Sequence, residues 1–198
     1  MYSIATTDAL VSPATNQELI DWAKLDSDDP NIASSLLVAT KLVISFLSLE
    51  LIARTYTLLY EDWPVVGTVD SGHLSRANYQ YKTRIDLPYA NALSIAEVKV
   101  NDTAVLAADY RIIKGKPDKI QLTQIGYSNE DNIALKVVYS AGFGASADDV
   151  PNAIVQAIVM IAAYIHGHAG GCDVGKAVKD SGAAELLTPF AVNAGIVI

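Results

Sequence analysis

Two apolar segments with helical spacing, separated by a central run of short alternating segments, most constrain how this chain can fold. Across residues 32–49, apolar residues recur at steps of three and four, which predicts a helix buried around most of its circumference. Residues 153–165 form an apolar run that only Gln156 interrupts. This run is too short to cross a bilayer, which needs about 20 residues. It therefore predicts a second buried helix rather than a membrane span.

Local signals mark where the helices begin. Thr15-Asn16-Gln17-Glu18 has the spacing of a capping box and predicts a short helix to about residue 25. Asp29-Pro30 predicts the start of the long helix, with Asp29 as N-cap, and Val150-Pro151 predicts the start of the third. A last short helix is expected over residues 179–187, before Pro189.

The middle of the chain has the pattern of a β structure. Residues 54–59 are rich in β-branched and aromatic residues and predict a strand leaving the helix. Residues 65–78 follow as an expected loop. Five short runs then alternate with turn residues and predict strands. These runs cover residues 79–87, 94–100, 110–113, 119–122 and 133–139.

The order of these elements predicts an α+β fold, in which a small bundle of about four helices carries an antiparallel β domain inserted between its second and third helices. We expect three parts: an N-terminal helical part over residues 1–60, an inserted β domain with its long loop over 61–139, and C-terminal helices with a tail over 140–198. The third part is expected to pack with the first.

Charge excludes several classes of function. The chain has 14 Lys and Arg against 22 Asp and Glu, a net charge of −8, and residues 1–70 alone carry 3 basic and 10 acidic side chains. Non-specific nucleic-acid binding needs clustered cations, and anionic membranes attract them, so neither partner is expected. The single cysteine, Cys172, requires no oxidising compartment, and we expect no signal peptide at the N-terminus.

The candidate chemical motifs are incomplete. His166, His168 and Cys172 resemble a metal-ligand cluster, but a second pair of ligands is missing. Gly142-Phe143-Gly144 has the position of a phosphate-binding loop, yet the fingerprint is incomplete and Asp148-Asp149 would repel a phosphate. No nucleophile elbow is present. We therefore expect no enzyme activity, no cofactor and no metal.

Several stretches together resemble one family, the head-to-tail connector (adaptor) proteins of long-tailed bacteriophages. They are ELIDWAKLDSDDPNIASSLLVATKLVISFL, RTYTLLYEDWP, IDLPYANALSIAEVKVND, LKVVYSAGFGASADDVPNAIVQAIVMIAAYI and the closing Leu186-Leu187-Thr188-Pro189-Phe190. The most specific is the fourth, with its Tyr-x-Ala-Gly-aromatic-Gly turn and Val-Pro helix start. The resemblance spans most of the chain.

This resemblance implies a homo-oligomeric ring of about a dozen subunits beneath the portal protein, joining the capsid to the tail-side neck or tail-terminator protein. Genome DNA would pass through the ring without sequence-specific binding. The protein would be made in the bacterial host cytoplasm and would reside in the neck of the virion. The alternative is a tail-completion or tail-terminator protein, which would also need ring interfaces and a passage for DNA.

Three groups of residues are expected to serve such a ring. The apolar helices suggest a subunit interface, the acidic N-terminal part suggests a channel wall, and the apolar C-terminus suggests a segment that docks on the portal. The candidates are Leu42, Phe46 and Ile154 for the ring interface; Glu18, Asp21, Asp28 and Asp29 for the channel lining; and Leu186, Leu187, Phe190, Ile196 and Ile198 for portal docking.

Overall fold

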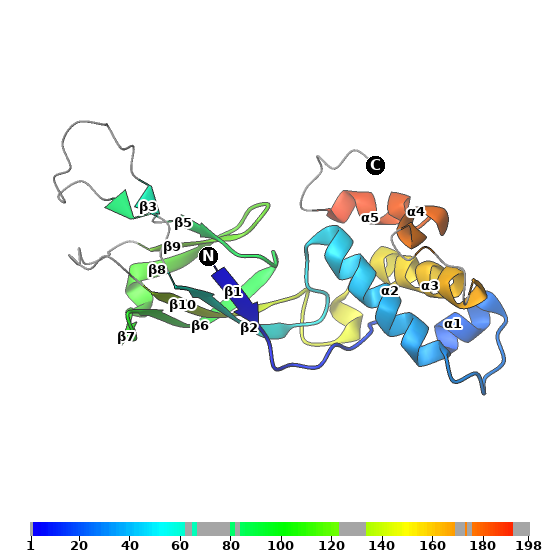
Figure 1. Ribbon diagram of the computed structural model, residues 1–198. Coiled ribbons are helices and arrows are strands. Elements are labelled where there is room, and N and C mark those ends of the chain that lie inside the picture. The colour runs from blue at the N-terminus through cyan, green and yellow to red at the C-terminus, as the bar shows by residue number, and fades with distance from the viewer. Residues whose placement is uncertain are drawn as a thin grey trace. The chain divides into compact units, whose positions relative to one another are not determined.

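The computed structural model describes residues 2–61, 65–66, 80–81, 84–122, 134–168, 173 and 176–191. The chain forms two compact units (Figure 1). The sheet unit comprises Met1–Thr7 and Arg54–Ala141, and the helical unit comprises Asp8–Ala53 and Gly142–Ile198. The α+β class and the insertion of strands between the second and third helices are confirmed.

The unit boundaries differ from the expected division after residues 60 and 139. The reason is strand pairing: Arg54 is paired with Ala141 at one end of a two-strand ladder, so both residues belong to the same sheet. The N-terminal strand is a second difference, because it lies in the part expected to be helical and pairs with residues 57–60.

The helical unit is built around α3 (Asn152–Gly167), which packs against the other four α-helices. These are α1 (Asn16–Ala23), α2 (Ile32–Leu47), α4 (Ala177–Asp180) and α5 (Ala184–Leu187). The core between them is aliphatic: α2 and α3 pack against each other, and their buried residues include Leu36 and Leu47 of α2 and Ile154, Ile158 and Ile161 of α3. Two 3₁₀ turns border these helices, Ala147–Asp149 and Thr188–Phe190.

The capping box before α1 is confirmed. The Thr15 backbone N–H donates to Glu18 Oε2 at 2.7 Å, and the Glu18 N–H donates to Thr15 Oγ1 at 3.2 Å. The expected start of α2 is two residues early: Asn31 is the N-cap, while the Asp29 carboxylate accepts the Asn31 N–H at 2.8 Å. This local bond holds a turn before the helix, so Asp29 does not cap it.

The sheet unit contains two main sheets and one short strand pair (Figure 1). The five-stranded sheet has the order β1 (Tyr2–Ala5), β2 (Arg54–Tyr60), β10 (Leu135–Ala141), β6 (Ala92–Val100), β7 (Thr103–Ala104). The three-stranded sheet has the order β5 (Arg84–Asp86), β9 (Lys119–Leu122), β8 (Tyr110–Ile113), and β3 (Val65–Val66) pairs with β4 (Gln80–Tyr81). All these pairs are antiparallel. A 3₁₀ turn, Ala107–Asp109, precedes β8.

One hydrophobic core joins the two main sheets. In β10, alternate residues from Leu135 to Ala141 are buried, and they cluster with Ile85 of β5 and Ile120 of β9. Aromatic rings fill part of this core: the ring centroids of Tyr56 and Tyr139 lie 5.8 Å apart. The two sheets therefore pack face to face as a sandwich.

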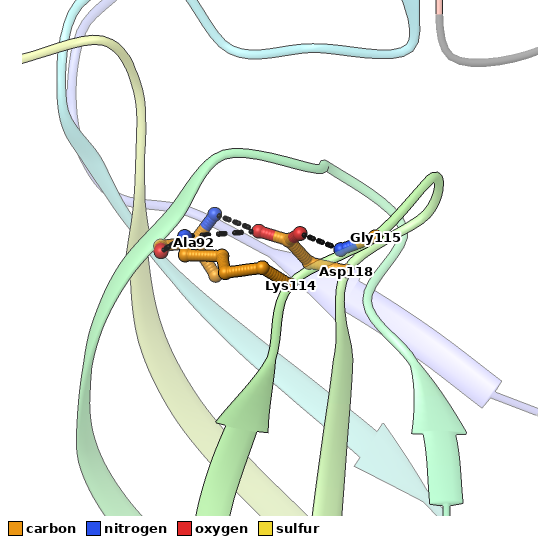
Figure 2. A network of polar contacts seen from close by, with 4 residues as sticks. All are labelled: Ala92, Lys114, Gly115 and Asp118. Carbon is orange, nitrogen blue, oxygen red and sulfur yellow. Dashed lines mark hydrogen bonds and ion pairs between the residues drawn. The ribbon is translucent and has the colours of Figure 1, made fainter.

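A buried carboxylate fixes one corner of the sandwich (Figure 2). Asp118 Oδ2 accepts the Ala92 N–H at 2.9 Å and Oδ1 accepts the Gly115 N–H at 2.9 Å. Lys114 Nζ lies 3.1 Å from Asp118 Oδ2 and also donates to the Ala92 carbonyl. Both carboxylate oxygens of Asp118 therefore have hydrogen-bond donors, as buried polar groups require. Because these donors come from the turn between β8 and β9 and from the start of β6, the network joins the two segments.

Candidate functional site

The histidines near the end of α3 have local structural partners. His166 Nε2 lies 3.2 Å from Asp29 Oδ2, and His168 Nδ1 lies 2.8 Å from the Tyr164 carbonyl oxygen. The His168 ring also stacks on Tyr164, with 4.3 Å between centroids. Cys172 lies outside the described residues. Within the described ranges, no group of three or more His, Cys, Asp or Glu side chains is arranged to hold a metal ion.

The glycine turn that resembles a phosphate loop has a packing role. Gly142 has a φ of 152°, and a Cβ there would lie 2.6 Å from the Ala53 backbone nitrogen. The absence of a side chain lets residues 51–53 approach: Phe143 N–H donates to the Leu51 carbonyl at 2.8 Å, and Ala53 N–H donates to the Gly144 carbonyl at 2.7 Å. The turn therefore uses its backbone groups to join two segments of the helical unit.

The acidic residues expected to line a channel fall into two places. Glu18 and Asp21 lie on the exposed face of α1, and Glu18 also completes the capping box. Asp28 is exposed in the turn before α2, whereas Asp29 is half-buried and paired with His166. By unit, the helical unit carries four lysines against twelve Asp and Glu, while the sheet unit carries ten of each sign. The whole net charge of −8 thus belongs to the helical unit.

The expected ring-interface residues are only partly available for contact with a neighbouring chain. Leu42 and Phe46 are half-buried on α2, but Ile154 is fully buried inside the helical unit. Its assignment to an interface is wrong, because it has no surface left for another chain. Two other apolar residues of α2, Leu37 and Val38, are 39% and 37% exposed, and the apolar pattern of the helix does not distinguish them from its core residues.

The expected portal-docking residues also differ in how much of their surface is exposed. Leu186 and Phe190 are half-buried, whereas Leu187 is fully buried where α5 packs against α3. Leu187 is therefore part of the core and cannot act as an external anchor. Ile196 and Ile198 lie outside the described residues.

A further charged surface lies on the outer face of the three-stranded sheet. Arg84 of β5 is paired with Gln121 of β9, and Gln121 is paired with Arg111 of β8, so the three residues form one row across the sheet. In the adjacent row, Lys119 Nζ lies 2.9 Å from Asp86 Oδ1. The alternate residues face the core, which leaves this row on the outside. No sequence motif marks it, because its members come from three separate strands.

A second charged group lies on the outer side of the five-stranded sheet. Glu97 Oε1 is 2.6 Å from Lys99 Nζ, and Glu97 Oε2 is 3.1 Å from Lys136 Nζ. Hydrogen bonds from Lys99 and then Lys136 lower the pKa of the Glu97 carboxyl. Here the two lysines are already engaged by a carboxylate of their own sheet.

Comparison with known proteins gives structural neighbours only. No protein-family model matches the chain, and no curated protein matches it. No described helix has both the length and the apolar character to span a membrane.

The structural matches come from gene transfer agent (GTA) particles. A chain from the neck of an empty GTA particle, computed with C6 symmetry, matches with a TM-score of 0.66 at 18% identity over 96% of this chain and 95% of that one. A chain from the virion of a native GTA particle matches with a TM-score of 0.68 at 18% identity, over 95% and 94%. A chain from the neck of a native GTA particle, computed with C12 symmetry, matches with a TM-score of 0.61 at 18% identity, over 96% and 94%. Along nearly its whole length, this chain therefore has the fold of chains from GTA necks and virions.

Proposed function

We propose that this chain is a structural virion protein, a head-to-tail connector that forms a ring of about a dozen subunits beneath the portal. The observation that carries the proposal is the nearly complete fold match to chains from particle necks, one of them computed with C12 symmetry. The family resemblance of the sequence supports the same function. The ring would join the capsid to the tail and leave a channel for genome DNA.

The charge of the helical unit supports a passage for DNA. A wall with clustered cations would bind phosphates and retain the genome, whereas an acidic wall repels them. The turn that contains Asp28 and Asp29 is our candidate for this wall, because Asp28 is exposed there.

The exposed face of α2 is our candidate for one part of the ring interface. Leu37 and Val38 place apolar surface on a helix that is already buried on its other side, and Leu42 lies half-buried on the same helix. Burial of such side chains by a neighbouring copy would contribute about 25 cal/mol for each Å² of apolar surface removed from water. In a closed ring, every copy would contribute the same area.

The C-terminal segment is our candidate for attachment to the portal. Leu186 and Phe190 retain exposed surface, and residues 192–198 continue the chain with no charged side chain. Since Leu187 belongs to the core, a truncation after Ala191 tests docking better than one that removes α5. We expect the truncated chain to fold and to lose attachment to DNA-filled heads.

The proposed function is tested by imaging particles that contain this chain. We expect electron cryomicroscopy of the neck to show a ring of this fold directly beneath the portal, and we expect removal of its gene to leave filled heads separate from tails. Binding assays with purified portal and tail-tube proteins then distinguish the alternatives. Portal binding supports a connector, and binding to the tail tube alone supports a tail-completion or tail-terminator protein. Absence of the chain from the neck would overturn the proposal.

A further inference from the structure

The row of Arg84, Gln121 and Arg111 presents two guanidinium groups on one side of the three-stranded sheet. Strand pairing places the three residues side by side, at the spacing of adjacent strands. The Gln121 side chain accepts from Arg111 twice, with Oε1 at 3.2 Å from Nε and 3.0 Å from Nη2. These bonds hold the Arg111 guanidinium in place and leave its other N–H groups available.

Among the described residues, no carboxylate is paired with either arginine of this row. Arg84 is exposed and has no hydrogen-bond or ion-pair partner within the described ranges, and Arg111 donates to the neutral Gln121. The neighbouring carboxylate, Asp86, is already paired with Lys119. The row is therefore a positive surface in a chain whose net charge is −8.

The helical unit contains a surface of opposite charge with an exposed aromatic ring. Residues 18–29 hold five acidic side chains and one lysine, which is the densest acidic segment of the chain. Asp21 and Trp22 of α1 lie three and four residues after Glu18, so the three side chains share one face of the helix. Trp22 is 54% exposed, and within the described residues Asp21 has no ion-pair partner. An exposed indole beside carboxylates suits a guanidinium, which stacks on the ring and pairs with the acid.

We propose that the Arg84–Gln121–Arg111 row of one subunit binds the Glu18–Asp21–Trp22 face of a second copy of this chain. The inference rests on the proposed ring and names two of its contact surfaces. Such a contact joins different faces of the two copies, and repetition of this type of contact generates a ring when the rotation closes. It also assigns Glu18 and Asp21 to a subunit boundary rather than to the channel wall.

Duplex DNA is the competing occupant of the arginine row, because phosphates also bind paired guanidinium groups. The observations favour a second copy for two reasons. The helical unit repels a polyanion with its net charge of −8, and the α1 face supplies carboxylates and an aromatic ring for the two guanidinium groups of the row. DNA binding through the row is therefore an outcome that would overturn the proposal.

The first experiment compares self-association of full-length variants by analytical ultracentrifugation. We expect R84Q/R111Q to raise the dissociation constant at least about tenfold at about 50 mM salt, because both cationic contacts are lost. K99Q/K136Q is the matched control: it removes the same charge from the sheet unit, but from lysines already paired with Glu97. We expect it to associate like the wild type. Circular dichroism shows whether each variant is folded.

The second experiment uses Trp22 as a reporter of the interface. The chain has two tryptophans, Trp22 and Trp63, so W63F leaves Trp22 as the single one. We expect its emission to shift to shorter wavelength as protein concentration rises, since the contact removes the indole from water. The shift should disappear in W63F/R84Q/R111Q and weaken in W63F/R84K/R111K, because lysine keeps the charge but loses the planar stacking group.

A charge swap tests whether the two surfaces meet each other. R84E/R111E and D21K should each fail to associate alone. Mixing the two should restore a complex, because the intact arginine row of D21K can bind the intact α1 face of R84E/R111E. The proposal is overturned if wild-type protein shows no salt-sensitive self-association, if R84Q/R111Q associates normally, or if the mixture does not. It is also overturned if a labelled DNA duplex binds wild type and not R84Q/R111Q. Absence of the chain from particle necks would overturn the proposed function whatever these variants do.

Discussion

The sheet unit and the helical unit distribute their charges in different ways. The sheet unit has ten residues of each sign, and it pairs many of them internally, including Lys119 with Asp86 and both Lys99 and Lys136 with Glu97. The helical unit has four lysines for twelve acids. Its described residues include the ion pairs of His166 with Asp29 and of Lys176 with Asp173.

The two units therefore differ in how their charges are neutralised. In a unit whose acidic and basic residues pair internally, little net charge repulsion remains in the folded state. A unit with a large excess of acidic over basic residues depends on salt, solvent or another molecule to reduce the repulsion among its carboxylates. The helical unit is therefore the part whose stability and contacts should respond most to its surroundings, and the following predictions test this contrast.

Removal of core side-chain volume should have the largest effect on stability, and it should affect the unfolding of each unit individually. We expect I154A to lower the free energy of unfolding of the helical unit by about 2–5 kcal/mol, because it leaves a cavity beside α2 and α3. I120A should cost about the same in the sheet unit. Circular dichroism at 222 nm reports the helices, and near-UV dichroism reports the sheet unit, which holds nine of the ten tyrosines. L37A, at an exposed α2 position, should change stability by less than about 0.5 kcal/mol. Equal effects of all three variants would contradict the assigned burial.

Loss of the Asp118 charge should affect the sheet unit next most strongly. D118N keeps the shape of the side chain, but its amide presents donors where the Ala92 and Gly115 N–H groups and Lys114 need acceptors. We expect a loss of about 1.5–3 kcal/mol in a urea unfolding experiment. D86N, in an exposed pair, is the control and should cost about 1 kcal/mol or less. A D118N variant as stable as D86N would show that the buried network does not hold this corner.

Salt should change the stability of the helical unit more than that of the sheet unit. Raising the ionic strength from about 20 mM to about 300 mM shortens the range of repulsion among the twelve acids. We expect the urea midpoint at 222 nm to rise, while the tyrosine signal of the sheet unit shifts much less. Equal shifts of both signals would contradict the contrast between the units.

The smallest effect concerns the turn before α3. The Ser146 backbone N–H donates to Asp149 Oδ2 at 2.9 Å and the Ser146 hydroxyl donates to the same oxygen at 3.0 Å, and these bonds lower the pKa of the Asp149 carboxyl. A lowered pKa in the folded state stabilises the protein above the unfolded pKa of about 4, and this contribution disappears as the pH falls through the folded pKa.

We therefore expect D149N to be less stable than wild type at pH 7 and to converge with it in acid. Urea unfolding at a series of pH values measures the difference. In an S146A background the difference should be smaller, because the hydroxyl donor has been removed. A constant difference across the whole pH range would contradict the role of the charge.

Local patterns made much of this fold predictable from sequence. The capping box at Thr15 and the strands that contain Tyr110 and Lys119 depend on neighbours within a few residues, so the sequence contains their signals. The first strand could not be predicted in this way. Tyr2–Ala5 is too short to show a period, and it becomes a strand only because residues 57–60 pair with it.

The candidate surfaces were harder to predict because they also depend on contacts between residues that are distant in the sequence. Leu37 and Ile154 both lie in helices that are apolar on most sides, so composition alone does not show which side faces the core. The structure exposes Leu37 and buries Ile154. The arginine row depends on the register of three strands, and residues 37 positions apart in the chain, such as Arg84 and Gln121, become neighbours only after pairing.

The insertion of the sheet unit also determines the order in which a new copy can be completed on the ribosome. Synthesis proceeds from the N-terminus, so α1 and α2 emerge long before α3, the helix that covers their apolar sides. The last strand of the sheet unit ends at Ala141, just before residue 142 resumes the helical unit. In each nascent chain, all strands of the sheet unit are therefore synthesised before α3. The apolar sides of α1 and α2 stay exposed until the last quarter of the chain has been translated.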